Sequence, residues 1–221
     1  MDDTLYDEID YYQSGMAAVA EVIAKDKVIS SEKAFDVLWR IFSSGNHHTT
    51  FNAALDELGI GYDKNYITRL VTALRAHKPK ITLPRESREV LEKLKDNYKL
   101  ALITDGFLPG QREKIAALGI EEFFDSIVCT EEMGREFWKP SKAGFEKMLK
   151  DLDLKPADCV YVGDNLEKDF LAPNKLGFKT VRIVRPRHIH LGDAPEKLAE
   201  PDCEINSISA LPELLEKISY V

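Results

Sequence analysis

The chain has 221 residues and a mass of 25.0 kDa, which allows one large domain or a core of ~150 residues with a smaller partner. Hydrophobic residues make up 44% and charged residues 31%, a mixture that can bury a core and that excludes a disordered or collagen-like chain. The net charge of −8 disfavours non-specific binding to nucleic acid or to an anionic membrane, since both reward clustered Lys and Arg.

The N-terminal sequence has no features of a secretory signal, because it opens with acidic residues rather than a basic segment and an apolar stretch. The longest apolar runs, such as 16-MAAVAEVIA-24, are shorter than the ~20 residues that span a bilayer. We therefore expect a cytoplasmic protein. The three cysteines form no C-x-x-C pair, so the sequence indicates neither a zinc site nor a disulfide framework.

The first third of the chain has the apolar spacing of helices. From about residue 9 to 77, apolar residues recur three and four positions apart, and Ser30-Ser31, Thr49-Thr50 and Asp63-Lys64 are suitable helix starts. This pattern predicts four helices and no strand. The segment 78-KPKITLPRES-87 has two prolines and reads as a connector. We assign 9–80 to a helical domain and 1–8 plus 81–221 to a second domain.

The second domain alternates between helices and short apolar strands. The predicted helices cover 85–96, 109–118, 141–152, 166–176 and 208–218, and the predicted strands cover 99–104, 127–130, 159–163, 180–184 and 203–205. Strands that alternate with helices of this length build a parallel sheet with helices on both faces. The fold class is therefore α/β, a parallel Rossmann-like sheet flanked by helices, with an all-helical domain attached. Because this alternation begins with a helix, we expect a further strand before residue 1.

Acidic residues, a threonine and a lysine lie where the predicted strands end or where the chain begins. They are Asp2 with its neighbours in 1-MDDTLYDE-8, Thr104-Asp105-Gly106 after an apolar strand, Lys139-Pro140 in a loop, and Asp164 and Asp169 in 163-GDNLEKD-169. Ligands of parallel sheets bind at the carboxyl ends of strands. Carboxylates from separate strand ends repel one another unless a cation lies between them, and hard oxygen ligands suit Mg²⁺. A lysine and a threonine hydroxyl can hold phosphate oxygens, so the set indicates phosphoryl transfer.

Each of these features is weak alone, because paired acids near a terminus are usually solvated and Gly-Asp after a strand is often a turn. Their order resembles the haloacid dehalogenase superfamily, specifically its phosphatase branch with a helical cap inserted after the first strand. Met1-Asp2-Asp3-Thr4 resembles the Asp-x-Asp-x-Thr motif from the x position onward. The strand-ending Thr is matched by 101-ALITDG-106, the Lys-Pro motif by 138-WKPSKAGF-145, and Gly-Asp-x-x-x-x-Asp by 163-GDNLEKD-169.

The resemblance implies a role for each matched residue. Asp2 would be the general acid and base and would offer its backbone carbonyl to Mg²⁺, Asp164 would be a metal ligand, and Asp169 a ligand or a nearby acid. Thr104 would bind the phosphoryl group and Lys139 would link the nucleophile to the phosphate, with Asp105 and Gly106 beside them at the substrate. A carboxylate at the position of Asp2 favours a phosphate ester over a haloacid as substrate. The resemblance thus implies a Mg²⁺-dependent phosphohydrolase of a small phosphorylated metabolite, working through an aspartyl phosphate, with no nucleic-acid or membrane partner; homo-oligomerisation is left open.

The match departs from the family at the nucleophile. The attacking Asp of the family motif would fall one residue before Met1, and the apolar strand that carries it would also lie upstream. We expect Met1 to be an internal methionine of a longer reading frame. The alternative is a catalytically silent member of the family, which would form no phosphoaspartyl intermediate. A signalling receiver module fits poorly, since such modules are shorter and order their motifs differently, and no G-x-G-x-x-G supports a dinucleotide-binding domain.

Overall fold

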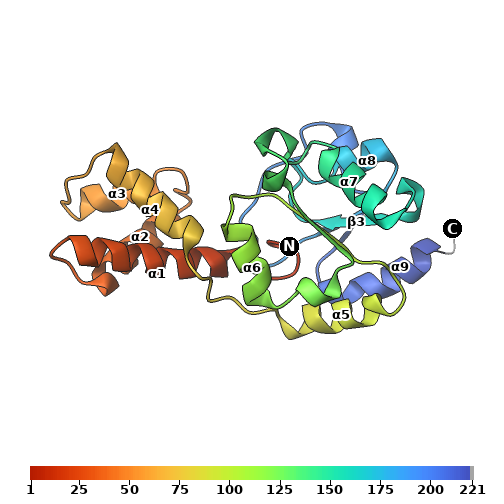
Figure 1. Cartoon of the computed structure of the whole chain (residues 1–221), viewed down its shortest axis with the longest axis horizontal. Coiled ribbons are helices and arrows are strands. Elements are labelled where there is room, and N and C mark those ends of the chain that lie inside the picture. The colour runs from red at the N-terminus through yellow and green to blue at the C-terminus, as the bar shows by residue number, and fades with distance from the viewer. Residues whose placement is uncertain (220–221) are drawn as a thin grey trace. The chain divides into compact units, whose positions relative to one another are not determined.

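A computed structural model describes residues 1–219 of the chain (Figure 1). The chain forms two compact units, one made of Met1–Ile9 with Thr82–Val221 and the other of Asp10–Ile81. We call them the core unit and the helical unit and describe each by itself. Over the described part of the chain, no helix is both long and apolar enough to cross a membrane.

The helical unit contains the four helices that the apolar spacing predicted, and residues 9–77 contain no strand, as expected. The helices are α1 (Glu8–Asp26), α2 (Ser31–Ser43), α3 (Thr50–Glu57) and α4 (Lys64–Ala76). Two of the expected start signals form side-chain caps, with Ser30 accepting from the Lys33 amide and Asp63 from the Tyr66 amide, which satisfies backbone donors that a helix start leaves free. The unit is held together by fully buried apolar side chains from all four helices, among them Val19, Leu38, Leu55 and Leu70.

The core unit alternates between helices and parallel strands, as predicted. In chain order it contains α5 (Arg85–Lys95), β1 (Ala101–Thr104), α6 (Gly110–Leu118), β2 (Ser126–Cys129), α7 (Ala143–Leu152), β3 (Val160–Gly163), α8 (Leu171–Leu176), β4 (Lys179–Ile183), β5 (Cys203–Ile205) and α9 (Leu211–Ser219). The α/β fold class is confirmed.

Helices cover both faces of the strands (Figure 1). On one face, α5 and α9 pack against β4 and β5 through Val90, Val181, Ile205 and Leu215. On the other, α7 and α8 pack against β1 and β2 through residues such as Ile103, and Tyr161 of β3 joins the same cluster. β3 contributes to both clusters, through Val160 and Val162 on one face and Tyr161 on the other. The packing therefore connects the strands of the core unit.

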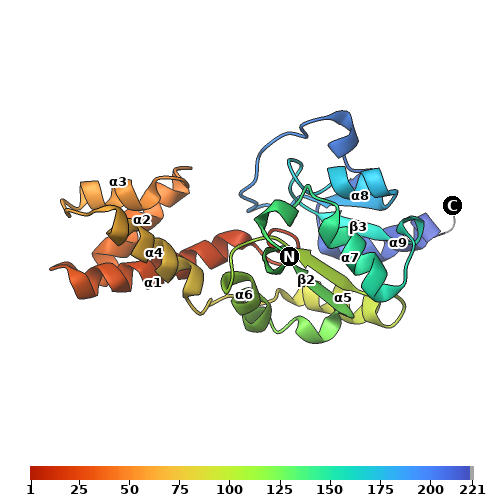
Figure 2. The same ribbon diagram turned by 45° about the horizontal axis from the view of Figure 1, so that its top comes forward.

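The strands form two sheets rather than one. β1 pairs with β2, and β3, β4 and β5 form a separate sheet in that order. Consequently β1 and β3 each have a strand partner on one side only within the described residues. The N-terminal segment lies between their carboxyl ends, since Asp2 contacts Gln111 after β1 and the Met1 amino group interacts with Asp164 after β3 (Figure 2).

The helix predicted for 166–176 was too long, because α8 begins only at Leu171. The preceding residues fold into a loop around the Asp169 carboxylate, whose Oδ2 accepts the backbone amides of Asp164 and Asn165. Side-chain acceptors of this kind compete with helical hydrogen bonds. The loop is close to the strand end, and a Cβ at Gly163 would lie 2.6 Å from Asp169 Oδ2, so the glycine allows this approach.

Candidate active site

The structure brings the polar residues of separate strand ends into one connected network. Lys139 Nζ lies 2.7 Å from Asp169 Oδ1, and the Lys139 backbone amide donates to Asp105 Oδ2 at 3.2 Å. Gln111 connects this group to the chain start, because its side-chain amide donates to the Asp105 carbonyl and, at 3.5 Å, to Asp2 Oδ2. The network therefore joins the loops that follow β1 and β3 to the N-terminal segment.

Lys139 is a buried cation in this network. Its Nζ contacts both Asp169 and the hydroxyl of Tyr161, at 2.7 and 3.1 Å. Burial opposes the charge, but the neighbouring carboxylate of Asp169 holds the pKa of Lys139 well above its usual value. Burial likewise raises the pKa of Asp169, yet Lys139 outweighs it and lowers that pKa to about 2. The pair thus stays ionised, and the ammonium can attract a phosphate dianion.

Asp164 is in a different electrostatic environment. Burial and the nearby Asp169 carboxylate raise the pKa of Asp164 to about 7. None of the side-chain hydrogen bonds or ion pairs found among residues 1–219 involves its carboxylate. Its backbone amide and carbonyl bond to Asp169 and Arg182, and its carboxylate interacts electrostatically with the Met1 amino group. A half-buried carboxylate in this setting is available to a cation.

Asp2 is held by side chains from two segments. Its Oδ1 accepts from Tyr6 Oη at 2.6 Å and from Lys114 Nζ at 2.7 Å. Burial alone would raise the pKa of Asp2, but the Lys114 ammonium, the Met1 amino group and the hydrogen bonds from Lys114 and Tyr6 lower it to about 2. In this arrangement Asp2 is ionised, which is the state that a general base requires.

Thr104, Asp105 and Gly106 form the carboxyl end of β1 and the start of the loop that follows it. Thr104 ends the strand and is buried, and Gly106 has a φ of 140°, a backbone conformation that glycine adopts most readily. The sequence assigned Asp105 to the substrate, but both of its carboxylate oxygens bind protein donors, Oδ1 the Thr130 hydroxyl at 2.7 Å and Oδ2 the Lys139 amide. Asp105 therefore joins three loops, and we assign its carboxylate to holding Lys139 in place.

Sequence reasoning missed several residues of the network, namely Tyr6, Glu8, Gln111, Lys114 and Tyr161. Gln111 and Lys114 are three residues apart on α6 and so lie on one helix face, directly after the motif at Thr104. That position was a usable signal, but both are long polar side chains that usually stay in solvent. His190 also reaches this network, because its Nε2 lies 3.3 Å from Glu8 Oε2.

The donor chemistry fits a divalent cation only in part. Of the two carboxylates that the resemblance proposed as ligands, that of Asp169 is bound to Lys139 and two backbone amides. The backbone carbonyl of Asp2, the other proposed ligand, accepts the Thr4 hydroxyl at 3.2 Å. Asp164 offers a half-buried carboxylate with no hydrogen bond found among residues 1–219. No group of three or more potential metal-ligating side chains occurs among residues 1–219, so a cation here would be held by Asp164 together with backbone carbonyls, water and substrate oxygens, as Mg²⁺ often is.

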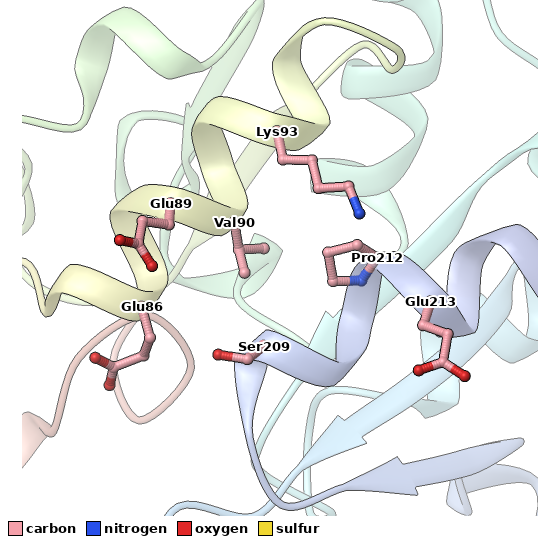
Figure 3. Close-up of a pocket in the computed structure, with 7 residues that line it drawn as sticks. All are labelled: Glu86, Glu89, Val90, Lys93, Ser209, Pro212 and Glu213. Carbon is pink, nitrogen blue, oxygen red and sulfur yellow. The ribbon is translucent and has the colours of Figure 1, made fainter.

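A separate surface pocket lies between α5 and α9 (Figure 3). Its lining includes Glu86, Glu89, Lys93 and Glu213, and all four are in ion pairs with neighbouring charged side chains. Exposed pairs of this kind are weakly stabilising surface features. This pocket contains none of the residues of the network around Lys139, so we do not place the active site there.

Comparison with known proteins identifies the class. The family model for haloacid dehalogenase-like hydrolases matches residues 1–183, and the chain belongs to this family. Among solved structures, a 2-haloacid dehalogenase from Pseudomonas syringae superimposes with a TM-score of 0.65 over 98% of this chain and 96% of its own, at 23% identity. The fold is thus that of the haloacid dehalogenase-like hydrolases.

Curated relatives are phosphatases. A glyceraldehyde 3-phosphate phosphatase from Methanocaldococcus jannaschii is 30% identical over 99% of this chain and 95% of its own length. A human N-acylneuraminate-9-phosphatase is 34% identical over 62% of this chain and 54% of its own. This similarity supports an enzyme of the phosphatase branch rather than a dehalogenase.

Proposed function

We propose that the chain provides the scaffold of a Mg²⁺-dependent phosphohydrolase that acts on a small phosphorylated metabolite. The observation that carries this proposal is the buried ammonium of Lys139, held between Asp169 and Tyr161 at the strand ends where Thr104 and Asp164 also stand. A fixed buried cation beside a hydroxyl and an available carboxylate suits a phosphoryl group, whose charge it would stabilise. The activities of the two relatives named above, on glyceraldehyde 3-phosphate and on an N-acylneuraminate 9-phosphate, support this substrate class.

In the proposed reaction Lys139, Thr104 and Asp164 bind the phosphoryl group and its metal ion, and Asp2 transfers protons. Lys139 and the Thr104 hydroxyl bind phosphoryl oxygens, and Asp164 would hold Mg²⁺, which neutralises phosphoryl charge when it is bound. Asp2 protonates the leaving oxygen while the ester P–O bond breaks and a carboxylate–phosphorus bond forms. Asp2 then takes a proton from water, which attacks phosphorus; the carboxylate–phosphorus bond breaks, the attacking carboxylate is regenerated and inorganic phosphate leaves. A bound phosphate dianion would raise the pKa of Asp2 through like-charge repulsion, which suits the first of these steps.

The attacking carboxylate needs a place in the sheet. By resemblance it stands at the end of a strand, and β1 and β3 each have an edge without a strand partner. We propose that the active form has a strand between them that ends in the nucleophilic Asp. The helical unit, residues 10–81, has the position in the sequence at which the family inserts its cap, and we propose that it is the cap.

The alternative is a catalytically silent member of the family. The split sheet favours it for the 221-residue chain, because no carboxylate in the described residues occupies the end of a strand between β1 and β3. Such a protein would keep Lys139 and Asp164 and could still bind phosphate, but it would form no aspartyl phosphate.

One assay separates the two. The 221-residue protein, with its mass confirmed, and a version extended by the codons upstream of Met1 are tested with glyceraldehyde 3-phosphate, N-acylneuraminate 9-phosphate and p-nitrophenyl phosphate, with MgCl2 or with EDTA. We expect Mg²⁺-dependent phosphate release from the extended protein, lost in Asp164→Asn and kept in Asp158→Asn, an exposed control. Turnover by the 221-residue protein would contradict the need for the additional strand. Inactivity of both proteins would contradict the phosphatase proposal.

A further inference from the structure

We propose that Lys114 of α6 is a positioning residue that holds the Asp2 carboxylate in the orientation from which Asp2 exchanges protons with the reacting oxygen. The inference rests on the proposed function, since it takes Asp2 as the acid and base. It concerns a residue outside all four motifs that carry the family resemblance.

The geometry places Lys114 between two carboxylates. Its Nζ lies 2.7 Å from Asp2 Oδ1 and 3.3 Å from Glu8 Oε1, although Asp2 and Lys114 are 112 residues apart in the chain. The Lys114 side chain is only 4% exposed, and those of Asp2 and Glu8 are 19% and 9% exposed. A lysine is almost never buried this far without such partners.

Stability alone is a weak reason to bury this ammonium. Removing ions from water is costly, and replacing buried ion pairs by apolar residues of similar volume is often neutral or stabilising. Apolar residues in place of Lys114, Asp2 and Glu8 together could therefore pack against α6 about as well as this ionic group. What an apolar residue lacks is a directed donor for Asp2, so orientation of that carboxylate is the property that requires lysine.

The hydrogen bonds leave the two oxygens of Asp2 unequal. Oδ1 receives both Tyr6 Oη and Lys114 Nζ, at 2.6 and 2.7 Å. The hydrogen bond found at Oδ2 among residues 1–219 comes from the Gln111 amide, at the 3.5 Å limit of a hydrogen bond. With Oδ1 fixed by two strong donors, Oδ2 is the oxygen that can give a proton to the leaving group and take one from water.

Glu8 fixes Lys114 from its other side. Glu8 is the first residue of α1, and its second oxygen, Oε2, lies 3.3 Å from His190 Nε2. The Lys114 ammonium is thus held by two carboxylates and has little freedom to turn away from Asp2. Replacing Glu8 should loosen Lys114 without removing it.

Substrates with different leaving groups distinguish positioning from a general structural role. An alkyl phosphate needs a proton on its leaving oxygen, whereas p-nitrophenolate leaves without one. The value of kcat/KM reports the steps up to departure of the leaving group. A misplaced Asp2 should therefore reduce kcat/KM for the alkyl phosphate by about 100-fold, in line with the usual contribution of a general acid, and for p-nitrophenyl phosphate by less than about threefold.

The experiment compares Lys114→Met, Lys114→Gln, Lys114→Arg and Glu8→Gln in the protein extended upstream of Met1. Lys147→Met, at an exposed position of α7, is the matched control. We expect the selective loss in the Met and Gln variants, a smaller loss in Glu8→Gln, and partial recovery in Lys114→Arg, which keeps a cationic donor. Equal losses on both substrates, or no loss, would overturn the inference. If Lys114→Met does not fold, the selective loss of activity is measured in Lys114→Gln and Glu8→Gln instead.

A second measurement does not depend on turnover. Crystal structures of the wild-type protein and of Lys114→Gln show where the Asp2 carboxylate lies in each. We expect the carboxylate to rotate in the variant, and an unchanged position would overturn the inference. Inactivity of the extended wild-type protein on every substrate would count against the proposed function, and these structures would then still decide whether Lys114 positions Asp2.

Discussion

The ammonium of Lys139 lies 2.7 Å from the carboxylate of Asp169, and both side chains are buried. The two residues come from different loops of the core unit, one before α7 and one after β3. Asp169 also accepts the backbone amides of Asp164 and Asn165. A single ion pair thus holds the Lys139 ammonium in place and shapes the loop that contains Asp164.

Breaking this pair should destabilise the protein strongly. Asp169→Asn would leave the buried Lys139 charge without its counter-ion, and we expect the free energy of unfolding to fall by about 3 kcal/mol. Urea denaturation followed by circular dichroism measures the change. The double variant with Lys139→Met should lose less than the sum of the two single changes, because neither charge then remains unpaired. Strict additivity would show that the pair is not coupled.

The contact between His190 and Glu8 should make stability depend on pH. The hydrogen bond to Glu8, opposed by burial, raises the pKa of His190. A raised pKa in the folded state means that the contribution is complete below the unfolded pKa of about 6.5 and is lost as the pH rises through the folded value. His190 is 37% exposed, so solvent screening limits the effect to about 0.5 kcal/mol.

Urea denaturation of the wild-type protein and of His190→Gln at pH 6 and pH 8.5 checks this dependence. We expect the variant to be less stable at pH 6 and nearly equal to the wild type at pH 8.5. His48→Gln, in an exposed turn of the helical unit, is the control. A difference that is larger at the higher pH would have the wrong sign for this contact.

The sequence predicted the fold class and most elements because these depend on local patterns. Apolar spacing identified α1 to α4, and the strand-end motif at Thr104 marked one edge of the site. The role of Lys114 was not predictable in this way, since 110-GQREKIAAL-118 reads as a helix with a solvated polar face, and only the approach of Asp2 and Glu8 makes burial of that lysine favourable. The hydrogen bond between Thr130 and Asp105 was also not predictable from local patterns, because the two residues are 25 positions apart in the chain.

The cap of α4 provides a test in the helical unit. Asp63 accepts the Tyr66 amide at 2.8 Å, which satisfies a donor that the helix start leaves free. We expect Asp63→Ala to reduce the free energy of unfolding by about 1 kcal/mol, measured by urea denaturation. Asp56→Ala, which removes an exposed carboxylate inside α3, should change it by less than about 0.5 kcal/mol. Equal effects of the two changes would contradict a specific contribution from the cap.

The split of the sheet predicts how fast backbone amides exchange with solvent. β4 is paired with β3 on one side and β5 on the other, whereas β1 and β3 each have an edge that no strand of residues 1–219 pairs with. Amides that point to a free edge lack a strand acceptor, and those of β4 that point to either neighbour have one. In the 221-residue protein, hydrogen–deuterium exchange followed by mass spectrometry should therefore show slow exchange over 179–183 and faster exchange over 101–104 and 160–163.

In the protein extended upstream of Met1, an added strand should slow exchange in β1 and β3 together and leave β4 unchanged. Protection of β1 and β3 equal to that of β4 in the shorter protein would mean that their edges are already paired, for example with a second copy, and would remove the place proposed for the nucleophile's strand.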